Sequence, residues 1–325
     1  MAETVGAEEN VVISAGECEV TILPRFGGKI ASIRMKGREL LQQPLAPIAP
    51  RTRMMGFDES DASGWDECLP SVAACEVEFA GAKVPVPDHG DLWRVEWTRE
   101  QGNEGTREQE NSLTLKGKCF SLPLELERTI ALKERGSTWR LSLFYKLTNT
   151  GTEPAPWSWS AHPLFAVDAG DAINLPNGMR EQLRLEGSGG GRLGKHGDKV
   201  DWPVAMLAGG GQTDLQFALP EDSGMGDKLF GGPVPAEVKT GWCEIFRPRA
   251  RVFLRVSFDA DTTPYLGLWL CYGGWPEKPG PKQMCVAVEP ATAPVDSLAE
   301  TGSWSRMLAP GESCEWAMAV DMRTL

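Results

Sequence analysis

Alternation of apolar and polar residues constrains this chain most, because it recurs in short runs along the sequence. The clearest runs are residues 18–22, 112–116, 124–130, 139–143 and 252–258. A period of two is typical of a strand with one buried face. Turn sequences such as Lys36-Gly37-Arg38 and Glu134-Arg135-Gly136 separate the runs, and 36 glycines and 24 prolines disfavour long helices. The sequence therefore predicts an all-β sandwich or barrel.

We expect one large domain over residues 1–325, because no segment is polar enough to act as a linker. Two glycine-rich stretches, at 186–200 and 209–211, lack the frame of a phosphate-binding loop. We interpret them as surface loops, with His196 as a solvated loop residue.

Charge and hydropathy exclude several classes of partner. The chain has 45 acidic and 33 basic residues, a net charge of −12, which argues against nucleic-acid binding. No apolar run approaches the ~18–20 residues of a membrane span. The N-terminus, residues 1–10, is acidic where a secretory leader would be basic, and the eight cysteines form no CxxC pair. We expect a cytoplasmic protein with reduced thiols, present as a monomer or homodimer.

Two of the three histidines lie in motifs that suit a site. His89 lies in the bend Pro87-Asp88-His89-Gly90-Asp91, and the alternate spacing of Trp93, Val95 and Trp97 predicts a strand after it. His162 precedes a proline after an aromatic strand segment. Glu289 follows the apolar run 284–288, which predicts a buried strand. Two imidazoles and a carboxylate are suited to proton transfer near neutral pH. Each of the three could also be an ordinary polar residue at a strand end.

Aromatic residues beside carboxylates suggest sugar binding, since sugars present both apolar C–H faces and hydroxyl rims. Trp65, Asp66 and Glu67 stand together between a glycine and a proline, as a loop or strand edge. We predict that Trp65 and at least one of Trp157 and Trp159 line the pocket. The alternative is a core tryptophan with two solvated acids.

Other catalytic chemistries have weaker support. His89, His162 and a carboxylate could in principle bind zinc or iron, but neither an HxH nor an HExxH frame is present, so we expect no metal. A GxSxG elbow is absent, and no cysteine has the context of a nucleophile.

Five segments, in order, resemble the aldose 1-epimerase (galactose mutarotase-like) superfamily. They are residues 26–33 with 37–41, His89-Gly90, His162-Pro163 with Phe165, Asp227-Lys228-Leu229-Phe230, and Glu289-Pro290 with Asp296 and Leu298. The resemblance covers most of the chain.

The resemblance implies a large antiparallel β-supersandwich that interconverts the α and β anomers of a hexose or related sugar. Glu289 would take the proton of the C1 hydroxyl, while His162 protonates the ring oxygen. His89 and Asp227 would orient the sugar. Trp65, Asp66, Glu67 and Trp159 are further candidate sugar-binding residues, which the aromatic and acidic sequence contexts indicate and the resemblance does not. The implied partner is a small-molecule sugar, and no cofactor is implied.

One departure leaves the sugar open. Galactose mutarotases carry a substrate-binding arginine shortly before the first histidine, whereas the nearest upstream arginines here are Arg51 and Arg53. With Arg25, these could supply the cations that a phosphorylated hexose would require. Two other functions remain: a non-catalytic sugar-binding protein of this fold, and a lyase, hydrolase or metal-dependent isomerase on the same scaffold.

Overall fold

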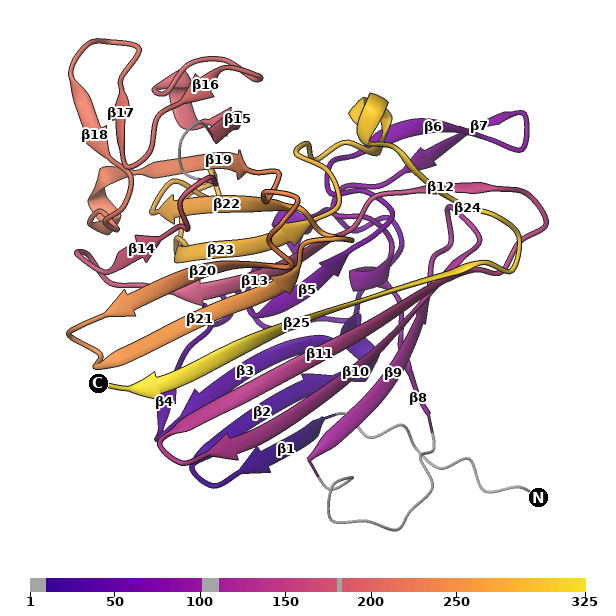
Figure 1. The fold of residues 1–325 in the computed structure, drawn as a ribbon, viewed down its shortest axis with the longest axis horizontal. Helices are drawn as coiled ribbons and strands as arrows, with labels where there is room; N and C mark the ends of the chain where they lie inside the picture. Colours follow the sequence, from indigo (N-terminus) through magenta and orange to yellow (C-terminus); the bar gives the residue numbers. More distant parts are fainter. Residues whose placement is uncertain (1–9, 101–110, 180–182) are drawn as a thin grey trace.

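The computed structural model describes residues 10–100, 111–179 and 183–325, which form β-strands and short 3₁₀ helices. Residues 1–9, which make up most of the acidic N-terminal segment, lie outside the described residues. Two large antiparallel sheets carry most of the strands (Figure 1). The expected all-β class is confirmed.

The larger sheet has 11 strands. Ten of them follow the order β1-β2-β3-β5-β13-β23-β22-β19-β15-β16, and β4 pairs with β3. Their bounds are β1 Val11–Ala15, β2 Cys18–Leu23, β3 Lys29–Met35, β4 Arg38–Glu39, β5 Trp65–Cys68, β13 Ser160–Ala166, β15 Leu183–Ser188, β16 Lys199–Val200, β19 Met225–Gly231, β22 Tyr265–Tyr272 and β23 Met284–Ala291.

The second sheet has eight strands in the order β14-β20-β21-β25-β11-β10-β9-β8. Their bounds are β8 Thr98–Arg99, β9 Ser112–Lys118, β10 Leu124–Arg135, β11 Thr138–Asn149, β14 Ala172–Asn174, β20 Thr240–Arg247, β21 Val252–Asp259 and β25 Ser313–Thr324.

Three two-stranded sheets and seven 3₁₀ helices complete the described structure. The small sheets are β6–β7 (Cys75–Phe79, Ala82–Val86), β12–β24 (Ala155–Trp157, Arg306–Leu308) and β17–β18 (Val204–Met206, Gln212–Asp214). The helices are η1 Pro24–Phe26, η2 Phe57–Glu59, η3 Leu92–Arg94, η4 Gly189–Gly191, η5 Glu221–Ser223, η6 Leu298–Glu300 and η7 Gly302–Trp304.

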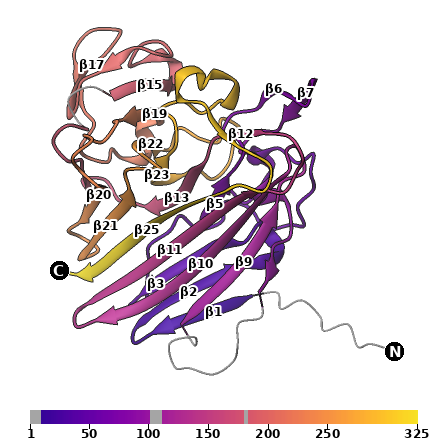
Figure 2. The same cartoon turned by 45° about the vertical axis from the view of Figure 1, so that its right-hand side comes forward.

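The two large sheets pack face to face, with the strands of the second sheet in front of β1, β2 and β3 in Figure 2. The strands form because every second side chain is buried between the sheets. In β10 the positions from Leu124 to Leu132 alternate between buried and partly buried, and in β11 buried positions alternate with partly buried or exposed ones. One hydrophobic cluster contains buried residues of both sheets, for example Val20 and Ile33 of one and Leu126 and Leu143 of the other.

A buried ion pair joins the two sheets inside this core. Glu67 on β5 accepts hydrogen bonds from Arg128 Nη1 at 2.9 Å, from the Tyr145 hydroxyl at 3.0 Å and from Trp159 Nε1 at 2.9 Å. Arg128 also donates to the carbonyl oxygen of Gly28. Neither Glu67 nor Arg128 is exposed to solvent. A charge in a core is tolerated only with such partners.

Three local expectations differ from the structure. Residues 65–68 form a strand inside the larger sheet, not a loop or edge. The segment after His89 forms helix η3 and not a strand, because two successive positive φ angles, 58° and 67°, turn the chain there. The glycine-rich segment 186–200 contains the end of β15, helix η4 and β16. His196 is nevertheless exposed, as expected.

Candidate active site

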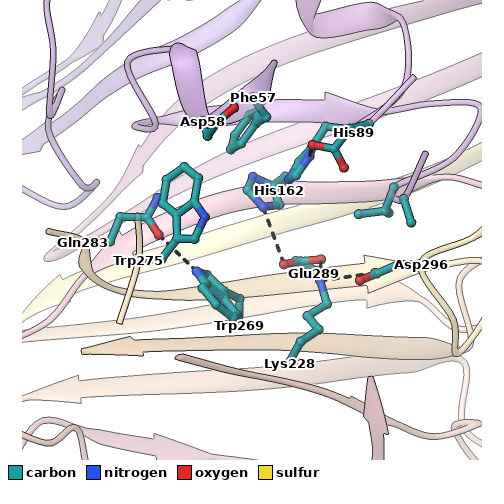
Figure 3. A pocket seen from close by; sticks show the side chains of 13 residues that line it. Phe57, Asp58, His89, His162, Lys228, Trp269, Trp275, Gln283, Glu289 and Asp296 are labelled. Atoms are coloured by element: carbon teal, nitrogen blue, oxygen red, sulfur yellow. Dashed lines mark hydrogen bonds and ion pairs between the residues drawn. The ribbon is translucent and has the colours of Figure 1, made fainter. Parts of the chain in front are cut away.

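A cavity of about 420 Å³ opens on the face of the larger sheet that points away from the second sheet. Its size suits a small-molecule ligand. Side chains from η2, β13, β19, β22, β23 and the connecting segments line it (Figure 3). They are Phe57, Asp58, Val72, Ala73, Asp88, His89, His162, Lys228, Trp269, Trp275, Gln283, Glu289 and Asp296.

His162 and Glu289 lie opposite each other on the neighbouring strands β13 and β23. The pairs Ser160↔Ala291 and Leu164↔Ala287 bracket them, and the same register places His162 across from Glu289. His162 Nε2 lies 3.8 Å from Glu289 Oε1. Within the described residues, neither Glu289 Oε1 nor His162 Nδ1 has a hydrogen-bond partner. Glu289 Oε1 therefore keeps hydrogen-bonding capacity for a ligand.

Lys228 on β19 holds the other oxygen of this carboxylate. Its ammonium donates to Glu289 Oε2 and lies 3.5 Å from Asp296 Oδ1. Strand β22 runs between β19 and β23, and Gly267 is its residue opposite Glu289. A Cβ at Gly267 would lie 3.2 Å from Glu289 Oε2, closer than ordinary contacts. The missing side chain thus leaves room for Lys228 and Glu289 to meet across β22.

Lys228 is charged in this setting. Burial alone would lower its pKa, but the carboxylates of Asp296 and Glu289 together raise the pKa of Lys228 well above its usual value. Burial raises the pKa of Asp296, and Lys228 opposes that shift. The ammonium is therefore fixed between two acids, which orients Glu289 with Oε1 toward His162.

His89 lies beside His162, with ring centroids 5.1 Å apart and planes nearly perpendicular. The Phe57 ring stacks on His89 at 3.8 Å. Asp88 Oδ2 is 2.8 Å from His89 Nδ1. Burial raises the pKa of Asp88, but His89 and Arg94 hold it below its usual value, so Asp88 is a carboxylate and only accepts. His89 Nδ1 therefore carries the proton, which leaves Nε2 for a ligand.

Aromatic side chains form the remaining wall of the cavity. Trp269 Nε1 donates to Gln283 Oε1 at 3.0 Å, and Gln283 Nε2 donates to the Ala62 carbonyl at 3.1 Å. Trp275 lies 6.1 Å from Phe57, centroid to centroid. Aromatic faces beside carboxylates suit a ligand with both apolar and hydroxyl surfaces.

We predict that His162 is a neutral imidazole at pH 7. Burial, and then the nearby His89 and Lys228, lower the pKa of His162 well below its usual value, and the opposing effect of Asp66 is smaller. In ¹⁵N NMR spectra, its ring should keep neutral-imidazole shifts well below pH ~6.5, where an unfolded histidine takes up a proton. Protonation at or above pH ~6.5 would contradict this environment.

The structure brings together three of the residues that the sequence singled out: His89, His162 and Glu289 all line the cavity. Lys228 and Asp296 belong to the motifs around Asp227 and Glu289, but the sequence did not predict that either would line the site. Phe57, Trp269 and Trp275 were not predicted. Their sequence contexts carry no signal, because the cavity gathers them from separate segments.

Three of the predicted sugar-binding residues lie in the core instead. Trp65 and Glu67 point toward the second sheet, because side chains alternate along β5 and the intervening Asp66 takes the cavity face opposite His162. The Trp159 ring packs against Tyr145 at 4.9 Å and also faces the core. None of the three lines the cavity, and neither does Trp157, so the expectation of a direct contact with the ligand is corrected.

Asp227 and Asp66 also lie outside the cavity lining. Asp227 projects from the opposite face of β19 to Lys228, where Ser188 Oγ and Arg192 Nε donate to it at 2.6 and 2.8 Å. Asp66 accepts from Lys29 at 2.7 Å and from Arg51 at 3.1 Å. Both carboxylates already have hydrogen-bond partners, and the structure does not place either among the residues that line the cavity, where a sugar ligand was expected.

The upstream arginines do not reach the cavity either. Arg51 is bound to Asp61, Asp66 and the carbonyl oxygens of Phe26 and Trp93. The Arg53 guanidinium lies over the Phe120 ring at 4.9 Å. Neither residue lines the cavity.

Two further observations concern the described residues alone. In residues 10–100, 111–179 and 183–325, no group of three or more His, Cys, Asp or Glu side chains is placed to hold a metal ion. None of the helices in this part of the chain has the length and apolar character needed to cross a bilayer.

Solved structures resemble this chain over nearly its whole length. The Slr1438 protein from Synechocystis sp. PCC 6803 has a TM-score of 0.68 at 15% identity, and the match covers 100% of this chain and 99% of that one. A galactose mutarotase-like protein from Lactobacillus casei ATCC 334 has a TM-score of 0.67 at 16% identity, covering 97% and 100%. The GalM/aldose epimerase homologue from C. elegans has a TM-score of 0.63 at 13% identity, covering 98% and 100%.

No protein-family model matches the chain, and no curated protein does. The likeness to solved structures, at 13–16% identity, concerns the fold. The chain has the galactose mutarotase-like fold, an antiparallel β-supersandwich, which confirms the expected architecture.

Proposed function

We propose that this protein is an aldose 1-epimerase, which interconverts the α and β anomers of a sugar by opening and closing its ring. The observation that carries the proposal is the pairing of His162 Nε2 and Glu289 Oε1, 3.8 Å apart, in a cavity of about 420 Å³. The C1 hydroxyl and the ring oxygen of an aldose are bonded to the same carbon. One acid and one base at this separation can therefore act on both oxygens.

In the proposed steps, Glu289 Oε1 takes the proton of the C1 hydroxyl while His162 delivers a proton to the ring oxygen. The bond between C1 and the ring oxygen breaks, which gives an aldehyde and a free hydroxyl. After rotation at C1, the hydroxyl attacks the other face of the aldehyde, and the two protons return. Each positioned acid or base contributes roughly 10²–10⁴-fold to the rate.

Lys228 and His89 act as positioning residues in this proposal. Lys228 binds Glu289 Oε2, so the carboxylate presents Oε1 to the sugar. His89, fixed by Asp88 and by the stacked Phe57 ring, offers Nε2 as an acceptor to a sugar hydroxyl.

A sugar-binding protein without catalysis is the second candidate. The observation that favours it is the low pKa of His162, because a neutral imidazole is a poor acid. The protonated form of such a histidine is a strong acid, but it is scarce at pH 7. An enzyme built on it would work faster as the pH falls toward the pKa of His162.

Polarimetry of freshly dissolved α-aldoses over a range of pH distinguishes the two candidates. The epimerase should bring the rotation to equilibrium faster than buffer alone, and kcat/KM should rise as the pH falls from about 8 to about 6. A protein that binds sugars but leaves the buffer rate unchanged at every pH would contradict the proposal and support the second candidate.

A further inference from the structure

The cavity is acidic. Among the described residues that line it, the carboxylates of Asp58, Asp88, Glu289 and Asp296 face a single ammonium, that of Lys228. Four acidic side chains against one basic side chain give the lining a formal charge of −3, counted over its Asp, Glu and Lys residues. Charge in a concave site with low-dielectric walls acts strongly on a ligand.

The single cation of the lining is already engaged. Lys228 donates to Glu289 and lies 3.5 Å from Asp296, so two acids neutralise it before any ligand arrives. A phosphate or carboxylate group would have to compete with both. Arg51 and Arg53, the other candidate cations, lie outside the lining in their own contacts with Asp61, Asp66 and the Phe120 ring.

The hydrogen-bonding groups of the lining also disfavour an anionic ligand. Ionised carboxylates only accept hydrogen bonds. Asp58, Asp88, Glu289 and Asp296 thus offer acceptor oxygens, and Glu289 Oε1 has no donor among the described residues. A ligand that suits this wall brings donors, which hydroxyl and ammonium groups do and phosphate dianions do not.

The aromatic side chains of the cavity also favour a ligand that carries a positive charge. Phe57, Trp269 and Trp275 line the same cavity as the four acids. Aromatic faces attract ammonium groups, and the effect grows when water is excluded.

We propose that this cavity selects sugars without an acidic group, and that an amino substituent strengthens binding. The preferred ligands are neutral aldoses and amino aldoses, and the disfavoured ones are sugar phosphates and uronic acids. The inference rests on the proposed function only in taking a sugar as the ligand.

Matched sugar sets test the inference by binding and not by turnover. Each set contains one aldose, its 2-amino-2-deoxy derivative, its 6-phosphate and its uronic acid, in the gluco, galacto and manno configurations. Trp269 and Trp275 line the cavity, so ligand binding can be followed by tryptophan fluorescence. In the best-bound configuration, we expect the amino sugar to bind at least about threefold more tightly than the parent, and the phosphate at least about tenfold more weakly. Both differences should shrink as salt is added.

Asp296→Asn supplies a matched charge variant. It removes one of the two acids that engage Lys228. The ratio of the dissociation constant of the 6-phosphate to that of the parent sugar should therefore fall by at least about threefold. Glu134→Gln is the control, because it removes one negative charge at an exposed residue at the end of β10, outside the cavity lining. Glu134→Gln should leave this ratio of dissociation constants unchanged.

The outcomes separate this inference from the epimerase proposal. Phosphates or uronic acids that bind as tightly as the parent sugars would overturn the inference, even if anomer exchange is catalysed. The expected order of affinities without anomer exchange would support the inference and contradict the epimerase. Failure to bind any member of the three sets would contradict both.

Discussion

Glu289→Gln should reduce catalysed anomer exchange by about 10²–10⁴-fold and leave the affinity for a neutral aldose nearly unchanged. The amide has the shape of the carboxylate, and its oxygen can still accept the hydrogen bond of Lys228. It cannot take the proton of the C1 hydroxyl, so only the proton-transfer step is lost. Exchange rates by NMR and affinities by tryptophan fluorescence measure the two effects separately.

Glu244→Gln is the matched control for this variant. Glu244 lies on β20 of the second sheet, where Arg255 donates to it at 3.1 Å, and it does not line the cavity. The control should exchange anomers at the wild-type rate. If Glu289→Gln stays within tenfold of the control, Glu289 is not the base.

Arg128→Met should lower the free energy of unfolding by about 3–5 kcal/mol, because it leaves Glu67 as an unpaired carboxylate in the core. Burial raises the pKa of Glu67, and Arg128 is the strongest of the groups that oppose this shift. Without Arg128 the pKa of Glu67 would rise further above its unfolded value. The variant therefore recovers stability at low pH and loses it as the pH rises, which urea unfolding at several pH values would measure.

Arg140→Met provides the comparison for this prediction. Arg140 on β11 pairs with Asp321 at 2.8 Å, but both side chains are about one-third exposed, so the loss should be below about 1 kcal/mol. Sugar affinity should be unchanged in both variants, because neither pair lines the cavity. Equal losses of stability in the two variants would mean that leaving Glu67 unpaired in the core costs no more than losing an exposed ion pair.

Much of the fold could be predicted because one face of each strand is buried. The run 124–130 alternates in sequence, and it lies in β10 with alternating burial. The run 252–258 behaves in the same way in β21. Turn residues such as Gly136, with φ of 64°, end these strands where the sequence indicated.

The alternation of apolar and polar residues is lost where both faces of a strand are covered. Trp65, Glu67 and Asp227, which were wrongly expected to contact the ligand, lie on such strands. All residues of β5 and of β19 are buried, so their burial does not distinguish one face from the other. A shift of one residue exchanges the two faces of a strand. For this reason the sequence favoured Asp227 on β19, whereas Lys228 lines the cavity, and it favoured Trp65 on β5, which faces the core.

His162 and Glu289 could be singled out because a histidine before a proline and a carboxylate after an apolar run are unusual in strands. Their distance could not be predicted, because it depends on the pairing of β13 with β23, which are far apart in the chain. The charge of the cavity could not be predicted either, because its acidic residues come from four separate segments. These are η2, the segment before His89, β23 and the loop after β23.

Saturation-transfer NMR at equilibrium tests the central claim most directly. One anomeric proton is irradiated and the signal of the other is followed, for neutral and amino aldoses, with wild-type protein, His162→Ala and Glu289→Gln. The account predicts transfer well above the buffer rate for the wild type, and transfer near the buffer rate for both variants. Wild-type transfer at the buffer rate for every sugar that binds, or undiminished transfer in both variants, would contradict it.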